Sequence, residues 1–132
     1  MSDHIAHIGI CDDTFRLAAL HPQINDTFKR LMVERQDDAH MGCVTRHADK
    51  WSANIIAHAR DQATKPEGDA NAERKLAFVL GSLTHRAADR LTKPITNCWK
   101  GEPDSGAFGS AANESKIVQD IFVWKEVFNS GH

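Results

Sequence analysis

Apolar residues recur at intervals of three and four along almost the whole chain, and no segment shows the period-two alternation of a half-buried strand. With 132 residues, 41% of them hydrophobic and 26% charged, the chain has the size and composition of one globular domain over residues 1–132. No apolar run approaches the roughly 18 residues that a membrane span requires. The sequence therefore predicts an all-α fold, a bundle of about five helices.

Turn residues and prolines divide the chain into the expected helices. The first helix ends near Leu20, because the residue before Pro22 avoids the helical region of backbone conformation. Residues 37–48 are ambiguous, and Gly42 among them marks either a break or a close approach of two helices. The other four expected helices cover residues 27–36, 50–62, 72–92 and 114–128.

The helix expected at residues 72–92 has an apolar band that is too wide for a surface helix, which places it at the centre of the bundle. Pro94 is expected to end it. Residues 95–112 then form a long loop before the last helix, and loops of this length tend to be functional or mobile. The stripe of the last helix that we expect in the core consists of Ile117, Ile121, Trp124 and Phe128.

Charge and cysteine content exclude several classes of protein. Sixteen basic against eighteen acidic residues leave no basic surplus of the kind that a nucleic-acid binder shows. Three cysteines without a CxxC pair argue against a disulfide framework, and the first residues lack the basic and apolar parts of a secretory signal. We expect a cytoplasmic protein.

Histidine stands out in the composition. The chain has eight histidines and no tyrosine, and seven of the histidines lie within the first 85 residues. Histidine is the commonest metal ligand and the side chain that titrates nearest to neutral pH. The surplus therefore points to metal binding or acid–base chemistry.

The most specific pattern is the pair His85 and Asp89 in the expected central helix. Four residues apart, the two side chains share one helix face and can reach one metal ion. An imidazole and a carboxylate inside a hydrophobic helix cost several kcal/mol unless a cation or partner compensates them. Gly81, one turn earlier on that face, leaves room for an ion or a neighbouring helix. The structural alternative is a His–Asp hydrogen bond on the helix surface.

Two further segments offer ligands. In the first helix His4, His7 and Cys11 form one stripe, of which at most one or two residues can bind the same ion. The alternative for this helix is a buried apolar stripe with the histidines at its margin. Asp49 caps the helix expected at residues 50–62, or it turns with His47 into a cleft as an oxygen ligand.

Motifs of other enzyme classes are absent from the sequence. There is no GxSxG nucleophile elbow, no phosphate-binding GxxxxGK[ST] loop and no GxGxxG dinucleotide motif. The HExxH zinc motif is absent as well. The sequence therefore gives no support to those enzyme classes.

The segments GCVTRHAD at residues 42–49 and AFVLGSLTHRAAD at residues 77–89 resemble the helical zinc-dependent phospholipase C superfamily, whose relatives include single-strand-specific nucleases. In that superfamily a hydrophobic helix carries the pattern apolar-Gly-x-x-x-His-x-x-x-Asp, which Gly81, His85 and Asp89 match. An earlier segment of those enzymes supplies a carboxylate, for which Asp49 is the counterpart. An N-terminal histidine also contributes, and His4 or His7 takes that place here.

The resemblance implies a metal-dependent phosphoesterase that acts on a small phosphorylated substrate through a metal-activated water. Those enzymes bind three zinc ions, using further histidines after the central helix. Here no histidine lies between Asp89 and His132, and the last helix offers acidic residues such as Asp120. The implied site therefore holds one or two divalent ions, with zinc expected. Its ligand candidates are His85, Asp89, Asp49, His7, His4, His47 and Asp120.

A second hypothesis is a non-catalytic helical protein that binds metal without turnover or serves as an oligomeric structural protein. Trp99 and Trp124 would then contribute to an interface between copies in a homo-oligomer, because aromatic residues are enriched at such surfaces. Core packing is the simpler explanation for Trp124, which lies on an apolar stripe.

Overall fold

The computed structural model describes residues 4–45, 48–62, 65, 69, 71–99 and 111–130. All regular structure in these residues is helical, and they contain no strand. The predicted all-α fold is therefore confirmed. The helices are α1 (His4–Leu20), α2 (Asp26–Glu34), α3 (Gln36–Val44), α4 (Asp49–Gln62), α5 (Ala72–Trp99) and α6 (Ala111–Val123), followed by a π-helical turn, η1 (Trp124–Phe128).

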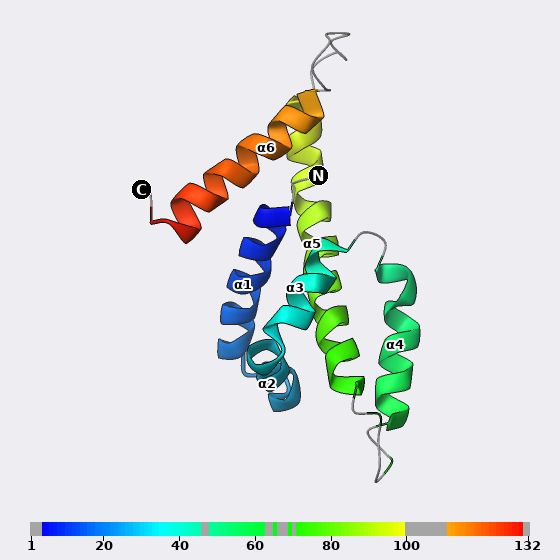
Figure 1. Ribbon diagram of the computed structural model, residues 1–132. Coiled ribbons are helices and arrows are strands. Elements are labelled where there is room, and N and C mark those ends of the chain that lie inside the picture. The colour runs from blue at the N-terminus through cyan, green and yellow to red at the C-terminus, as the bar shows by residue number, and fades with distance from the viewer. Residues whose placement is uncertain are drawn as a thin grey trace.

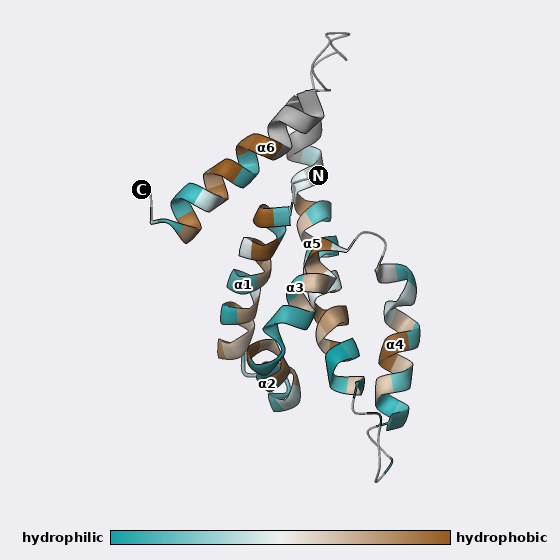
Figure 2. Ribbon diagram, viewed as in Figure 1, coloured by the Kyte–Doolittle hydropathy of each residue, from teal (hydrophilic) through white to brown (hydrophobic). Residues whose placement is uncertain are grey.

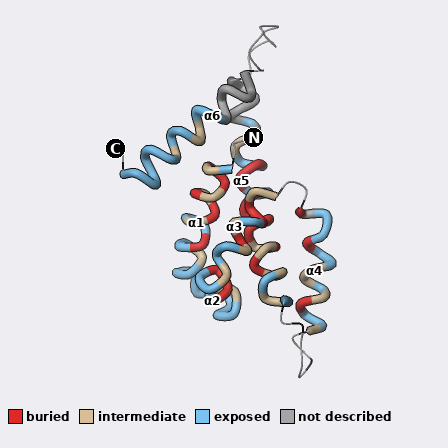
Figure 3. Tube along the Cα trace, in the orientation of Figure 1, coloured by how far each residue is buried: buried red, intermediate tan, exposed pale blue. Residues whose placement is uncertain are grey.

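The long helix α5 lies at the centre of the bundle, as predicted, and contacts α1, α2, α3 and α4 (Figure 1). Buried positions gather where α1, α3 and α5 face one another (Figure 3). The main apolar cluster there consists of Cys11, Phe15, Met32, Ala39 and Cys43. The apolar band of α5 is narrower than expected, because Leu83 and Leu91 are exposed.

Of residues 37–48, which the sequence left ambiguous, residues 37–44 belong to the helix α3, and Gly42 marks a close approach to α5. A Cβ atom added at Gly42 would lie 1.9 Å from the backbone oxygen of Phe78, and one added at Gly81 would lie 1.8 Å from that of Ala39. The two glycines thus let the backbones of α3 and α5 touch where any side chain would separate them. The room that Gly81 leaves is filled by the neighbouring helix, one of the two predicted possibilities.

The predicted end of the central helix at Pro94 is wrong, because α5 continues to Trp99. Proline removes one backbone hydrogen bond, here the bond to the carbonyl of Arg90. Arg90 is exposed, so water can satisfy that carbonyl and the helix survives the interruption. The expected loop at residues 95–112 is shortened by helix at both ends, and its central part lies outside the described residues.

The expectation that the apolar stripe of the last helix packs into the core is wrong. Ile117, Ile121, Trp124 and Phe128 are all exposed, and hydrophobic residues recur along α6 and η1 at the edge of the bundle (Figure 2). The contacts described for α6 are with α1 and η1. In the described part of the helix, residues 117–123, these contacts leave much of the apolar surface uncovered.

Replacing Gly81 with alanine should destabilise the fold. The new Cβ would overlap backbone atoms of α3 that cannot rotate away, so we expect the free energy of unfolding to fall by about 2–3 kcal/mol, although the better helix propensity of alanine offsets about 1 kcal/mol. Urea unfolding followed by circular dichroism measures this change.

Gly9→Ala is the matched control. Its Cβ would meet only the end of the Val123 side chain, at 3.0 Å, and the Phe128 ring at 3.9 Å, so the stability should change by less than about 1 kcal/mol. Equal stabilities of the two variants would show that the α3–α5 contact is not as tight as described.

Candidate metal centre

Three of the predicted ligands come together between α1 and α5. His7 projects from α1, and His85 and Asp89 project from one face of α5, one turn apart. All three side chains are buried, with 3%, 8% and 4% of the residue exposed respectively. One ligand atom from each lies within 4.8 Å of the other two. The group can hold a metal ion.

The carboxylate of Asp89 lies near the Nε2 atoms of both imidazoles. Its Oδ1 is 3.9 Å from Nε2 of His7, and its Oδ2 is 3.8 Å from Nε2 of His85. The two rings are stacked, with their centroids 4.1 Å apart. These nitrogen–oxygen separations are longer than a hydrogen bond of 2.7–3.2 Å. In a tetrahedral zinc site with bonds of about 2.1 Å, ligand atoms lie about 3.4 Å apart, so a small rotation of the side chains suffices to close around an ion.

The orientation of His85 is set by a backbone group of α3. Nδ1 of His85 is 2.7 Å from the carbonyl oxygen of Cys43, and a carbonyl can only accept, so Nδ1 carries a proton and donates it. In the neutral ring Nε2 then has the lone pair, and Nε2 is the atom that lies toward Asp89. Metal-binding histidines usually donate their other ring nitrogen to such an acceptor.

The α3–α5 contact explains why the carbonyl of Cys43 lies within hydrogen-bond distance of His85. Cys43 follows Gly42 directly, and His85 lies one turn after Gly81, so the glycine pair brings the end of α3 against the face of α5 that carries the imidazole. A larger residue at either glycine would move the acceptor away from His85.

His7 is held in its neutral form. Burial, together with the nearby His85, lowers the pKa of His7 from 6.5 to about 4, against the opposing effect of Asp89. A neutral imidazole is the form that binds a metal ion. At neutral pH an ion therefore has no proton to displace from His7.

The structure separates Asp120 and His4 from this group. Asp120, on α6, accepts a hydrogen bond of 3.0 Å from the backbone nitrogen of Ala6, so its carboxylate caps the first turn of α1. His4 is the exposed first residue of α1. Asp49 is the first residue of α4, but its side chain lies outside the described residues, as does His47 altogether.

Two other histidines pair with carboxylates away from the centre. Nε2 of His40 is 2.6 Å from Asp12, which links α3 to α1, and Nε2 of His58 is 3.2 Å from Asp69. These hydrogen bonds account for part of the histidine surplus: one joins two helices, and the other joins α4 to the segment before α5. Cys11, a candidate ligand by its spacing, lies in the apolar cluster with Cys43.

Sequence reasoning missed one functional group, the carbonyl oxygen of Cys43. Every residue has a backbone carbonyl, so the sequence carries no direct signal for it. The indirect signal was the glycine that precedes Cys43, which marked a possible close approach of helices without identifying the partner helix.

No protein-family model, curated protein sequence or solved structure matches this chain. Among the described residues, no helix combines the length and the apolar character needed to cross a membrane.

The low pKa of His7 predicts how stability depends on pH when no metal is bound. Between pH 6.5 and 4 the unfolded chain takes up a proton at this residue and the folded chain does not, so the unfolded state gains stability as the pH falls. The contribution of His7 to the free energy of unfolding is fully present above about pH 6.5. About 2–3 kcal/mol of this stability should be lost when the pH is lowered from 7.5 to 4.5. Urea unfolding in the presence of a chelator at the two pH values measures the loss.

A His7→Gln variant should lack this part of the pH dependence. His21→Gln, which replaces an exposed histidine, should keep it. The same pH dependence in the wild type and in His7→Gln would contradict the assignment.

Proposed function

We propose that this chain binds one divalent cation at His7, His85 and Asp89, and that zinc is the ion that these ligands suit best. The observation that carries the proposal is the burial of two imidazoles and a carboxylate within 4.8 Å of one another. Burying such groups together is costly unless a charge compensates them, and a divalent cation at their centre would do so.

The donor set favours zinc over the harder divalent ions. Two nitrogen atoms and one carboxylate oxygen are typical of zinc sites, whereas calcium and magnesium prefer oxygen ligands alone. The low pKa of His7 and the hydrogen bond that Nδ1 of His85 donates to Cys43 support the same conclusion, because His7 stays neutral at neutral pH and His85 directs its Nε2 toward Asp89.

Hydrolysis of a phosphoric ester is our proposal for the reaction. Three protein ligands leave one position of a tetrahedral ion open for water, and a bound metal ion lowers the pKa of such water toward about 7. The substrate would then be a small phosphorylated molecule. The burial of the three ligands supports a second candidate, an ion that joins α1 to α5 without turnover.

Zinc binding is tested on protein purified without a nickel column, by metal analysis and by titration calorimetry. We expect one zinc ion per chain and a rise in the melting temperature on addition of zinc, because an ion that binds only the folded state stabilises it. Asp89→Ala should abolish binding while the helix content stays the same.

Asp120→Asn is the control for this test. It keeps a side-chain oxygen for the cap of α1 and removes one carboxylate outside the centre, so its zinc affinity should equal that of the wild type. Wild-type affinity in Asp89→Ala, or no effect of zinc on the melting temperature of the wild type, would refute the metal centre.

Hydrolysis is tested with bis(p-nitrophenyl) phosphate and p-nitrophenyl phosphate. Activity of the zinc-loaded chain should disappear with a chelator, return with zinc and be absent in Asp89→Ala. A chain that binds zinc and hydrolyses neither compound nor other phosphoric esters would instead have a structural ion.

A further inference from the structure

A broad apolar band on α6 and η1 is only partly covered by α1, the helix against which α6 and η1 lie. It consists of Ile117, Val118, Ile121, Phe122, Trp124 and Phe128, which we call the α6 band, and each of these residues is between 42% and 65% exposed. Soluble monomers rarely expose so many large apolar side chains in one contiguous patch. The band therefore indicates a surface that is covered in the functional state.

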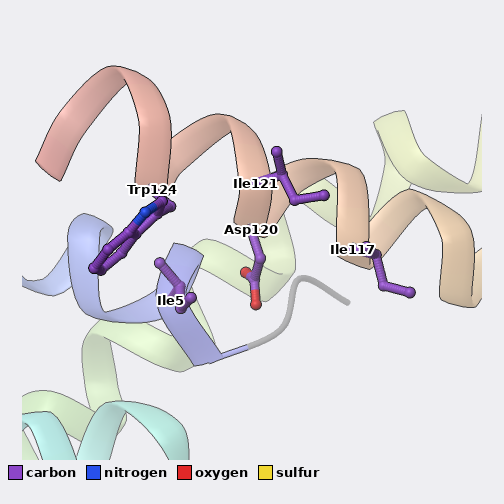
Figure 4. Close-up of a pocket in the computed structure, with 5 residues that line it drawn as sticks. All are labelled: Ile5, Ile117, Asp120, Ile121 and Trp124. Atoms are coloured by element: carbon purple, nitrogen blue, oxygen red, sulfur yellow. The ribbon is translucent and has the colours of Figure 1, made fainter. Parts of the chain in front are cut away.

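The attachment of α6 to α1 leaves most of the band uncovered. Asp120 and Val123 face α1, where Asp120 accepts from the Ala6 nitrogen and Val123 reaches Gly9. Figure 4 shows Trp124 beside Ile5 of α1, and Ile121 on the side of α6 that is turned away from α1. An open groove of about 490 Å³ is lined by Ile5 of α1 and by Ile117, Asp120, Ile121 and Trp124 of α6 and η1.

We propose that the α6 band is a homodimer interface in which α6 and η1 of two copies of this chain pack antiparallel. The proposal does not depend on the metal centre. Three properties of the band favour a second copy over other partners: its spacing, its area and its charge.

The spacing of the band is symmetric. Ile117, Ile121 and Trp124 follow one another at intervals of four and three residues, the spacing of a helix-pairing seam, and Phe128 follows four residues later in the π-helical turn η1, with its ring centroid 6.1 Å from that of Trp124. Reversing the direction of the helix leaves this pattern unchanged. An antiparallel copy therefore places Ile117 opposite Phe128 and Ile121 opposite Trp124 in both directions, as a two-fold symmetric interface requires.

The area and charge of the band agree with self-association. Six side chains exposed to this extent present several hundred Å², which approaches the about 800 Å² that each partner contributes to a stable interface. The charged residues between positions 117 and 130 are Asp120, Lys125 and Glu126. A segment with one cation and two anions has no attraction for an anionic membrane or for a strongly charged partner.

Sedimentation velocity of the full chain over a range of concentrations tests the proposal. The mass should rise from that of the 14.7 kDa monomer to about twice this value. Ile121→Glu places a charge in the middle of the seam and should weaken the association at least about tenfold. Leu20→Glu is the matched control, since Leu20 is 81% exposed at the end of α1 and outside the band, and it should dimerise like the wild type.

A second measurement needs no variant. Backbone amides of residues 117–128 should exchange hydrogen more slowly in concentrated than in dilute wild-type protein, while those of α4 should not change. A monomer at all concentrations, a dimer that survives Ile121→Glu, or exchange that is independent of concentration would overturn the proposal. So would a monomer that binds phosphatidylcholine vesicles through α6, which would make the band a lipid-binding surface.

Discussion

The contact between the backbones of α3 and α5 determines where the groups of the candidate metal centre lie. Gly42 and Gly81 allow the two helices to touch, and the residues beside them are the ones that the centre uses. The carbonyl of Cys43, next to Gly42, holds His85, one turn beyond Gly81, by its Nδ1 proton. The packing of α3 on α5 therefore determines the orientation of the His85 ring and places a proton on its Nδ1. Two residues without side chains control which nitrogen of His85 is able to bind an ion.

Burial has opposite consequences for the histidine and the carboxylate of the candidate metal centre. Hydrophobic packing around α5 removes water from His7, His85 and Asp89, which makes the neutral form of His7 stable and makes the carboxylate costly to bury. The two histidines come from different helices, and both approach the same carboxylate. An ion at this point would link the first helix to the central one, so metal binding and the packing of α1 on α5 are expected to be coupled.

The parts of this structure that could be predicted are those determined by local periodicity. Helical spacing identified most of the helices and the central position of α5, and the four-residue interval identified His85 and Asp89 as neighbours. Spacing could not choose between His4 and His7, because both lie in the first turns of α1, and only the docking of α1 on α5 buries His7. The sequence also could not decide whether Gly42 marks a break or a close approach of two helices, since its partner helix lies about forty residues away.

The two wrong predictions, for the apolar stripe of α6 and for the end of α5 at Pro94, have a common physical cause. An apolar stripe on a helix predicts that this face is buried, but it does not identify the surface that buries it. From the sequence alone, the stripe of α6 was assigned to the core of the same chain. Pro94 was read as a stop because proline removes a hydrogen bond, but an exposed position tolerates that loss. The burial of an apolar stripe and the tolerance of a proline both depend on what surrounds the helix, and the sequence of the helix alone does not specify this.

The cap of α1 also ties the beginning of the chain to its far end. The backbone N–H of Ala6 donates a hydrogen bond to the carboxylate of Asp120, which lies 114 positions later in the chain. α1 precedes α6 in the chain, so it lacks this stabilising bond until α6 has been made and has docked. The position of the first turns of α1, which carry His7, is therefore coupled to the docking of α6.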